Sequence, residues 1–379
     1  MQSHITFNRP YLIGTEFDRM QDAVGGLVIA EGGTFTTRCE RCLERIMGAP
    51  HVLLTSSCTH ALEMSALLLD LKPGDEVVMP TFTFVSTANA YALRGARPVF
   101  ADIRPDTMNL DEGLLSDRLS PRTRAIVVVH YAGVSCEMDE IGRIAEDAGV
   151  TLIEDNAHGL LGAYRGKQLG TFGAMSTQSF HETKNLTCGK GGALVLNDSE
   201  VFERARNIRN KGTNRDQFFG GQVDKYTWVD LGSSYMPPDI LSAFLLCQLE
   251  GRVHIQQKRR KVWERYRLEL SDWACSEGVQ QPTVPDYVEQ AYHMFYLLLP
   301  TAADRTRFIA HLSAHGIQAV FHYVPLHLSP MGERFGANLG DCPIAEDVSA
   351  RLVRLPFFTG MSEGEQAFIL KTIQQFSCG

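Results

Sequence analysis

Residues 124–155, RAIVVVHYAGVSCEMDEIGRIAEDAGVTLIED, hold two short apolar runs with a helical pattern between them. The runs cover 124–133 and 150–155 and are rich in valine and isoleucine, which is typical of strands buried on both faces. Two such strands joined by a helix lie parallel, because a parallel pair needs a long crossover to bring the chain back. The stretch therefore predicts the centre of a parallel sheet covered by helices.

The same alternation of strands and helices extends over the first 250 residues. Further β-rich runs at 51–57, 75–80 and 96–103 each precede or follow a helical pattern. An α/β protein is the architecture that this pattern predicts, with a large domain over residues 1–250.

The rest of the chain follows a different pattern. Residues 239–267 form one long helical pattern that leads out of the large domain. Apolar runs at 293–300 and 319–327 read as strands, with helical patterns between and after them. We therefore predict a smaller α+β C-terminal domain over residues 251–379.

Composition narrows the class of protein. A net charge of -8 and a pI near 5.9 argue against a nucleic-acid partner. The sequence starts with no recognisable secretory signal, and no apolar run approaches the roughly 20 residues that span a bilayer. Nine cysteines, an odd number, suit a reducing compartment. We predict a cytoplasmic protein with no membrane partner.

One cysteine pair needs separate treatment. Cys39 and Cys42 form a C-x-x-C spacing within an amphipathic helical pattern. No second pair follows, as a zinc site would need, and no histidine comes directly after Cys42, as in a haem attachment site. Packing is therefore the default interpretation, and no metal site is predicted.

Polar side chains gather where the predicted strands end. Ligands bind beyond the carboxyl ends of the strands in parallel α/β sheets, so this edge is the candidate site. The residues at these ends are Ser56, Ser57, Thr81, His130 and Asp155.

Asp155 ends the apolar run LIED, and a buried carboxylate without a partner is costly. Two interpretations remain open. The carboxylate forms a structural salt bridge, or it faces the cationic ring nitrogen of pyridoxal phosphate, where it strengthens the ring as an electron sink.

Lys184 lies in SFHETKNLTCGKGG, residues 179–192, behind a predicted strand and in front of three glycines. A lysine that attacks carbonyls must be neutral for part of the time, which burial can arrange. The glycines let the chain turn back with close backbone approach. The alternative is a tight hairpin that carries a solvated lysine.

A phosphate site is available at TSSCTHALEMSALLL, where hydroxyls precede a helix. The free N–H groups and the dipole of a helix N-terminus favour a phosphate there. An ordinary helix cap by Ser57 or Thr59 is the alternative. Phe84, after the next strand, either lies against a planar ring or packs in the core.

Taken in order, these signals resemble the DegT/DnrJ/EryC1/StrS sugar aminotransferase family, whose members have the fold type I architecture of PLP-dependent aminotransferases. The similarity extends over nearly the whole chain. By resemblance the large domain holds a mostly parallel seven-stranded sheet. The most similar stretches are PGDEVVMPTFTFVSTANA, RPVFADIRPDTMNLD, VVHYAG, IEDNAHG, SFHETKN and GGALVLND.

The resemblance implies pyridoxal 5'-phosphate as the cofactor. Lys184 would bind it covalently and then move a proton between the cofactor and the substrate, while Asp155 would pair with the pyridine nitrogen. His158 would lie near the ring hydroxyl and Phe84 would stack on the ring. The positions that match the phosphate site are Ser57, Cys58 and Ser179.

A homodimer with active sites between the subunits is also implied. Several family members complete the phosphate site with an asparagine of the neighbouring subunit, before a helix that here begins GSSYMPPDILSAF without one. Ser234 or a main-chain donor is the candidate replacement.

The substrate contacts follow from the same resemblance. His322, Tyr323 and Tyr131 match positions that contact the sugar or nucleotide, although core packing is the alternative for each tyrosine. His181 would line the site. Lys211 and Arg215 are candidates for binding the nucleotide diphosphate, with loop surface charge as the alternative.

Three stretches, SFHETKN, KGTNRDQFFGGQVDKYTWVDLGSSY and FHYVPLH, are most similar to the dTDP-4-amino-4,6-dideoxygalactose transaminases. The implied reaction moves an amino group from L-glutamate to C4 of a dTDP-4-keto-6-deoxyhexose, with 2-oxoglutarate as the other product. The alternatives are a 3-keto or UDP-linked ketosugar, or a non-catalytic regulatory protein of the same fold. The non-catalytic protein is disfavoured because Lys184 and Asp155 are both present.

Overall fold

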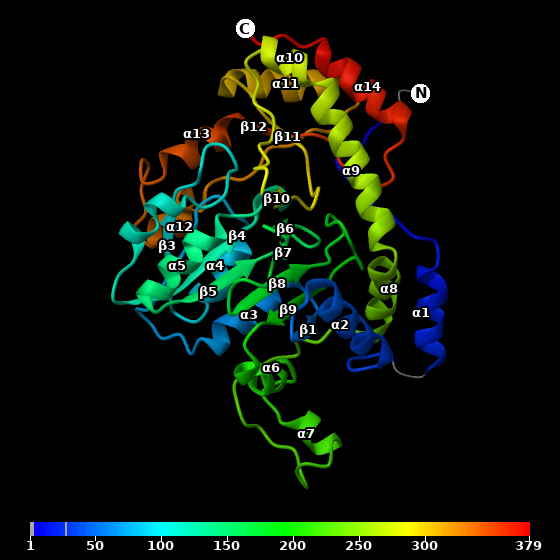
Figure 1. Ribbon diagram of the computed structural model, residues 1–379, viewed down its shortest axis with the longest axis vertical. Coiled ribbons are helices and arrows are strands. Elements are labelled where there is room, and N and C mark those ends of the chain that lie inside the picture. Colours follow the sequence, from blue (N-terminus) through cyan, green and yellow to red (C-terminus); the bar gives the residue numbers. More distant parts are fainter. Residues whose placement is uncertain (1–3, 27–28) are drawn as a thin grey trace.

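The computed structural model describes residues 4–26 and 29–379 and is built around a seven-stranded sheet (Figure 1). The strand order is β1-β9-β8-β5-β4-β2-β3. Only β9 runs against its neighbours in this sheet, so the predicted mostly parallel α/β sheet is confirmed. The strands are β1 (His51–Thr55), β2 (Glu76–Pro80), β3 (Arg97–Ala101), β4 (Thr123–Val129), β5 (Thr151–Asp155), β8 (Met175–Ser179) and β9 (Gly192–Leu196).

The continuous apolar runs of the central strands divide their side chains between two faces. Val127 of β4 lies opposite Ile153 of β5, and both belong to one buried cluster. Their neighbours Ile126 and Leu152 belong to a cluster on the other face, because side chains alternate along a strand. Burying each such side chain stabilises the fold by about 1.5–3 kcal/mol. Because both faces of the sheet carry these side chains, helices pack on both faces.

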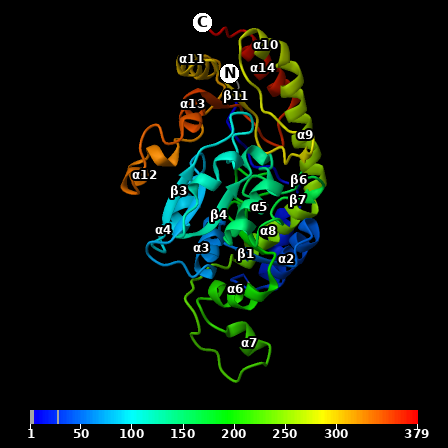
Figure 2. The same cartoon turned by 60° about the vertical axis from the view of Figure 1, so that its left-hand side comes forward.

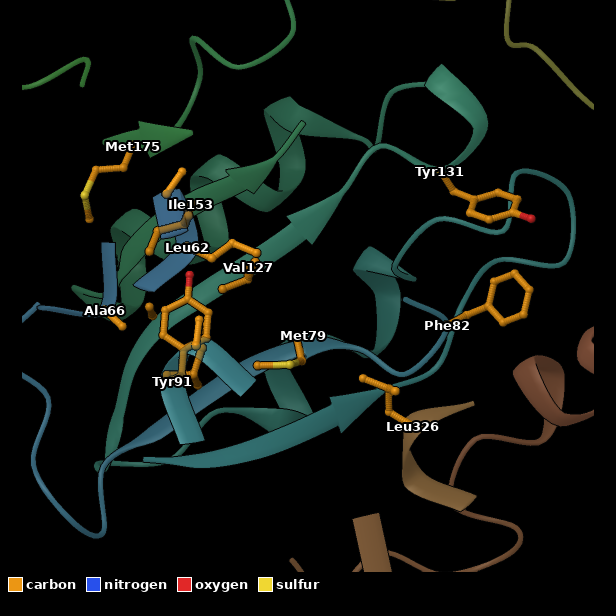
Figure 3. Close-up of a cluster of buried hydrophobic side chains, with 14 of the residues drawn as sticks. Leu62, Ala66, Met79, Phe82, Tyr91, Val127, Tyr131, Ile153, Met175 and Leu326 are labelled. Atoms are coloured by element: carbon orange, nitrogen blue, oxygen red, sulfur yellow. The ribbon is translucent and has the colours of Figure 1, made fainter. Parts of the chain in front are cut away.

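Helices α3 (Cys58–Leu68) and α4 (Val85–Ala92) cover the first of these faces. Leu62 and Ala66 of α3 and Tyr91 of α4 gather over Val127 of the sheet (Figure 3). These contacts hold the N-terminal ends of both helices beside the carboxyl ends of the strands.

The opposite face carries α5 (Met138–Ala148), α2 (Thr34–Met47) and α8 (Asp239–Glu250), with α1 (Glu16–Gly25) packed on α8. Cys39 and Cys42 of α2 are buried here, and the Cys39 thiol donates to the Ser242 carbonyl at 3.1 Å. Within residues 4–26 and 29–379, no three His, Cys, Asp or Glu side chains lie close enough together to hold a metal ion.

The C-terminal part has a core of its own, formed by residues 262–376 together with Ile5. This arrangement agrees with a smaller α+β unit, while the boundary between residues 250 and 251 stays a prediction. Its elements are α9 (Arg252–Glu269), α10 (Ser271–Ser276), β10 (Val288–Glu289), β11 (Tyr296–Leu298), α11 (Ala302–Ala314), α12 (Pro330–Arg334), α13 (Pro343–Arg351), β12 (Leu352–Arg354) and α14 (Glu363–Gln374); β10 pairs with a hairpin of the large part, β6 (Ala163–Tyr164) and β7 (Lys167–Gln168).

Two sequence predictions differ from the structure. The single helix expected over 239–267 is two helices, α8 and α9, which meet at Gly251 where the Ile13 side chain packs closely. The strand expected over 319–327 is wrong. Only Val320 pairs there, in an isolated bridge with Arg354, and the following residues line a cavity instead.

Residues 210–238, between α6 (Phe202–Arg209) and α8, form a long loop segment that leaves the main body and that we call the excursion. It carries the short helix α7 (Arg215–Phe219) and projects away from the sheet (Figures 1 and 2). Phe219 and Trp228 on it are exposed. None of the helices in the described part of the chain is both long and apolar enough to cross a membrane.

Candidate active site

A cavity of about 630 Å³ lies at the carboxyl edge of the sheet. The N-terminal ends of α3 and α4, the ends of β5 and β8, and segments of the C-terminal part enclose it. The lining residues that bear on the chemistry are Asn8, Ser57, Cys58, Thr59, Phe84, Thr87, Asp155, His158, Ser179, His181, Lys184, Lys190, His293, His322, Tyr323 and Arg354.

Asp155 is the last residue of β5 and is 5 % exposed. Its carboxylate accepts hydrogen bonds from Thr87 Oγ1 at 2.8 Å and from the Ala157 amide at 3.2 Å. Burial raises the pKa of Asp155, and these two hydrogen bonds oppose the rise. Over the residues that the structure describes, Asp155 has no salt bridge, so a cationic ring nitrogen at the cavity suits it.

Lys184 lies in the hairpin between β8 and β9 and faces the same cavity. Burial lowers the pKa of its amine to about 8, while nearby Cys58 and Asp155 act in the opposite direction. The Phe180 amide donates to the Gly191 carbonyl at 2.8 Å, and the Cys188 amide donates to the Phe180 carbonyl at 3.1 Å, so backbone hydrogen bonds hold the hairpin. The lysine is therefore an amine with a substantial neutral fraction near physiological pH, as carbonyl chemistry requires.

Polar groups at the start of α3 line another side of the cavity, and we call this part the polar cup. Ser57 caps the helix, its hydroxyl accepting from the His60 amide at 3.1 Å. Gly192 packs so closely here that a Cβ atom would lie 2.4 Å from the Cys58 nitrogen. With Ser179 and Lys190 also lining the cavity, the cup offers hydroxyls, helix amides and a cation to a phosphate.

Three buried histidines also line the cavity: His158, His293 and His322. His158 stacks on His293, with ring centroids 4.1 Å apart. Its Nδ1 atom has no hydrogen-bond partner among the residues described. Burial lowers the pKa of His158, His293 and His322 well below the usual range, so these rings are neutral. A neutral ring with a free nitrogen fits beside a ring hydroxyl of the cofactor.

The structure brings most of the sequence-predicted site residues together in this cavity. Tyr131 is the exception among the buried ones. It lies behind the lining, with its hydroxyl 3.0 Å from His322 Nδ1 and its ring beside Phe82 (Figure 3). The predicted residues that line the cavity are Ser57, Cys58, Phe84, Asp155, His158, Ser179, His181, Lys184, His322 and Tyr323.

Three predicted residues lie on or beside the excursion, outside the cavity of this chain. Lys211 forms an ion pair with Glu31, and Ser234 Oγ donates to the same carboxylate at 3.3 Å. Arg215 lies over the ring of Phe219. All three are exposed, and their assigned roles stay predictions.

Sequence reasoning missed several lining or supporting residues. Thr87 and Lys190 lie inside stretches already quoted for their chemistry, so their spacing from Phe84 and Lys184 could have indicated them. His293 and Arg354 carry no such signal, because tertiary packing alone brings them to the cavity. Asn185 supports the site by accepting from His293 Nδ1 at 2.9 Å.

The comparisons with known proteins agree with this geometry. A model of the DegT/DnrJ/EryC1/StrS aminotransferase family matches residues 11–374. The spore coat polysaccharide biosynthesis protein SpsC of Bacillus subtilis is 30% identical over 90% of this chain and 89% of its own. GDP-perosamine synthase of Escherichia coli O157:H7 is 28% identical over 98% of both chains. The aminotransferase TlmJ of Streptoalloteichus hindustanus has a TM-score of 0.90 and 29% identity over 98% of both chains.

Pyridoxal phosphate is the cofactor of the aminotransferase family whose model matches this chain. The residues at the cavity fit the group on three separate observations. They provide a buried carboxylate without a salt bridge, a lysine of lowered pKa and a helix N-terminus beside a lysine.

Replacing the lysine tests its assignment. Lys184→Ala is expected to abolish amino transfer and to remove the visible absorption band of lysine-bound cofactor, because no other amine replaces it. Both are measured on purified protein, with Lys167→Ala on exposed β7 as the matched control. Turnover by the variant without added amine would exclude Lys184 as the covalent residue.

Asp155→Asn is expected to keep the cofactor bound while slowing proton abstraction from the amino donor by roughly 100-fold or more. The neutral amide no longer stabilises a protonated ring nitrogen. Rapid mixing with the donor, followed by absorbance, gives the rate; Asp139→Asn, on the exposed surface of α5, is the control. An unchanged rate would move Asp155 to a structural role.

The lowered pKa of Lys184 predicts a pH dependence. With a pKa of about 8 instead of 10.5, the neutral fraction rises from roughly one tenth at pH 7 to nine tenths at pH 9. The rate at which cofactor-free protein takes up pyridoxal phosphate should therefore rise with pH through a midpoint near 8. A midpoint near 10.5 would show that the amine is solvated.

Proposed function

Because the chain belongs to the DegT/DnrJ/EryC1/StrS aminotransferase family, we propose that it transfers an amino group from L-glutamate to C4 of a dTDP-4-keto-6-deoxyhexose. The products would be a dTDP-4-amino-4,6-dideoxyhexose and 2-oxoglutarate. The observation that carries the reaction type is the cavity in which Lys184, with its lowered pKa, and the buried carboxylate of Asp155 both lie. The identity of the ketosugar rests on the three stretches similar to dTDP-sugar transaminases.

Bound pyridoxal phosphate supplies an electron sink for the negative charge left when a proton leaves the carbon that bears nitrogen. Lys184 takes that proton from Cα of the amino donor and later delivers a proton to C4 of the sugar. An amine of pKa about 8 does both near neutral pH, because neither its neutral nor its charged form is rare.

The remaining cavity residues orient and bind. Thr87 holds one carboxylate oxygen of Asp155 through a 2.8 Å hydrogen bond. Ser57, Cys58 and Ser179 receive the cofactor phosphate at the start of α3. Phe84, 56 % exposed at the cavity, offers a flat face for the ring, and His158 offers its free nitrogen to the ring hydroxyl.

Substrate recognition combines the C-terminal wall with a second subunit in this proposal. His322 and Tyr323 contact the sugar, with Tyr131 holding His322 from behind. The chain forms a homodimer, in which the exposed excursion brings Lys211 and Arg215 to the diphosphate and Ser234 to the phosphate of the partner's site. Exposed Phe219 and Trp228 on the excursion support its burial in a dimer.

The nine cysteines, all free, support a reducing compartment, and we place the reaction in the cytoplasm.

The second candidate keeps the cofactor and the residues but changes the ketosugar to a 3-keto or UDP-linked one. The E. coli relative is named GDP-perosamine synthase, so the name of one related protein carries a nucleotide other than dTDP. The face from which Lys184 delivers its proton sets the new amine axial or equatorial, and sugar orientation decides that face.

The direct test incubates the protein with pyridoxal phosphate, L-glutamate and dTDP-4-keto-6-deoxyglucose. We expect an aminated sugar whose C4 configuration is read from NMR coupling constants, axial for the galacto product and equatorial for the gluco product. Lys184→Ala is the control. Failure to aminate this sugar, together with turnover of a UDP-linked or 3-keto sugar, would replace the proposal with the second candidate.

A further inference from the structure

Two threonine hydroxyls form a buried chain that ends on the carboxylate of Asp155. Thr87 Oγ1 donates to Asp155 Oδ2 at 2.8 Å, and Thr83 Oγ1 lies 2.9 Å from Thr87 Oγ1. Both threonines line the cavity and are almost completely buried, with exposed fractions of 2 % for Thr83 and 0 % for Thr87. The chain of hydroxyls therefore lies in the cavity wall, directly behind the carboxylate.

The direction of the hydrogen bonds follows from the number of hydrogen atoms. An ionised carboxylate has none to donate, so Thr87 gives its single hydroxyl hydrogen to Asp155. The contact between the two threonines then needs Thr83 as its donor. Both hydroxyl dipoles thus point toward the ionised Asp155, and each hydrogen bond in such a chain strengthens the next.

Asp155 needs this support because its charge is costly where it lies. The residue is buried and forms no salt bridge in the part of the chain that the structure describes. Burial raises the pKa of Asp155, and the hydrogen bonds from Thr87 and from the Ala157 amide oppose the rise. Two hydrogen bonds to the charged form thus act where a counter-charge is missing.

The other titratable groups around the carboxylate do less. Lys184 and His130 also lower the pKa of Asp155, but they act more weakly than the hydrogen bond from Thr87. The His130 ring already bonds with Glu154 and with a backbone amide. The remaining titratable neighbours are uncharged near neutral pH because burial raises their pKa values; they are Cys58, Tyr91 and Tyr323.

Helix α4 holds the hydroxyls in place. Thr87 lies in its first turn, with its amide donating to the Phe84 carbonyl at 3.1 Å. One turn further along, the buried ring of Tyr91 packs over the sheet (Figure 3), and its hydroxyl lies 3.1 Å from Ser65 Oγ. Residues four apart lie on the same face of a helix, so the packing of Tyr91 also turns Thr87 toward the sheet.

The carboxylate keeps acceptor positions for a ligand. Oδ2 of Asp155 accepts from Thr87, and Oδ1 accepts from the Ala157 amide at 3.2 Å. A carboxylate offers about four acceptor positions, so one remains on each oxygen. Held at both oxygens, the carboxylate is restricted in rotation, which lowers the freedom lost when a ligand binds.

We propose that Thr83 and Thr87 are positioning residues that keep Asp155 ionised and orient its carboxylate toward a cationic ring in the cavity. Thr87 acts on the carboxylate directly, and Thr83 acts through Thr87. The inference rests on the proposed role of Asp155 beside the ring nitrogen. It goes beyond that role because it assigns the hydroxyls that set the pH range in which Asp155 is charged.

The test replaces each threonine by valine, which has a similar shape without the hydroxyl, and by serine, which keeps the hydroxyl. NMR of isotope-labelled aspartate carboxyl carbons gives the pKa of Asp155 in the cofactor-free protein, and Asp155→Asn identifies the signal. Loss of a hydrogen bond to the charged form favours the protonated form. The pKa of Asp155 should therefore rise in Thr87→Val, rise less in Thr83→Val and return toward the natural value in the serine variants.

Thr372→Val is the matched control. Thr372 is a buried threonine of α14 whose hydroxyl donates to the Phe368 carbonyl at 2.8 Å, and it does not line the cavity. It loses a buried hydroxyl as Thr87→Val does, so it should leave the pKa of Asp155 unchanged. If Thr87→Val does not fold, Thr83→Val decides, because it reaches Asp155 only through Thr87.

A kinetic measurement separates positioning from structural damage. Absorbance reports the reaction of the cofactor-loaded protein with L-glutamate without any sugar. Thr87→Val should slow this reaction about 10-fold near pH 7, the loss typical of one hydrogen bond to a charged group. The deficit should narrow as the pH rises, because Asp155 becomes ionised again.

An unchanged pKa of Asp155 in Thr87→Val, or an equal rise in Thr372→Val, would overturn the proposal. A deficit of the same size at every pH would do so as well, since structural damage does not depend on the charge of Asp155. Failure of the proposed role of Asp155 gives a different result. The pKa would rise in the valine variants, while Asp155→Asn reacted at the natural rate.

Discussion

The buried carboxylate of Glu154 holds the end of β5, and the active-site geometry depends on it. Glu154 is fully buried and accepts hydrogen bonds from the backbone amides of Gly170, Phe172 and Gly173 and from His130 Nε2 at 2.9 Å. Neighbouring side chains on a strand point to opposite faces. With Glu154 held on one face, Asp155 must point the other way, into the cavity.

Other side chains that line the cavity are also held by hydrogen bonds from neighbouring residues. Thr87 holds Asp155, Asn185 holds His293, and Tyr131 lies against His322. Each supporting residue restricts a side chain that lines the cavity, which lowers the freedom lost when substrates bind. Lys184 is different, since no residue in the described part of the chain holds its amine in this way, and a lysine that changes partners during a reaction needs that freedom.

Charge is distributed to suit two substrates of different chemistry. The helix start of α3 and the lysines suit phosphates, and the one carboxylate, Asp155, is placed for a cationic ring. Arg354 supplies the further positive charge on the side formed by the C-terminal part. The cavity thus draws on both parts of the chain, and neither part alone contains the complete set of residues.

Local patterns in the chain were enough to predict a parallel α/β sheet covered by helices, because apolar runs and helix periodicity are local properties, while the seven mostly parallel strands were implied by the family resemblance. They also indicated Asp155 and Ser57, which stand at the end of a strand and before the start of a helix, and Lys184, which follows a strand in a glycine-rich turn. The strand predicted over 319–327 failed because pairing needs a partner strand, and the tertiary structure provides one only for Val320. The positions of His293 and Arg354 at the cavity follow from packing between residues more than 100 positions apart from Lys184, and no local pattern encodes such contacts.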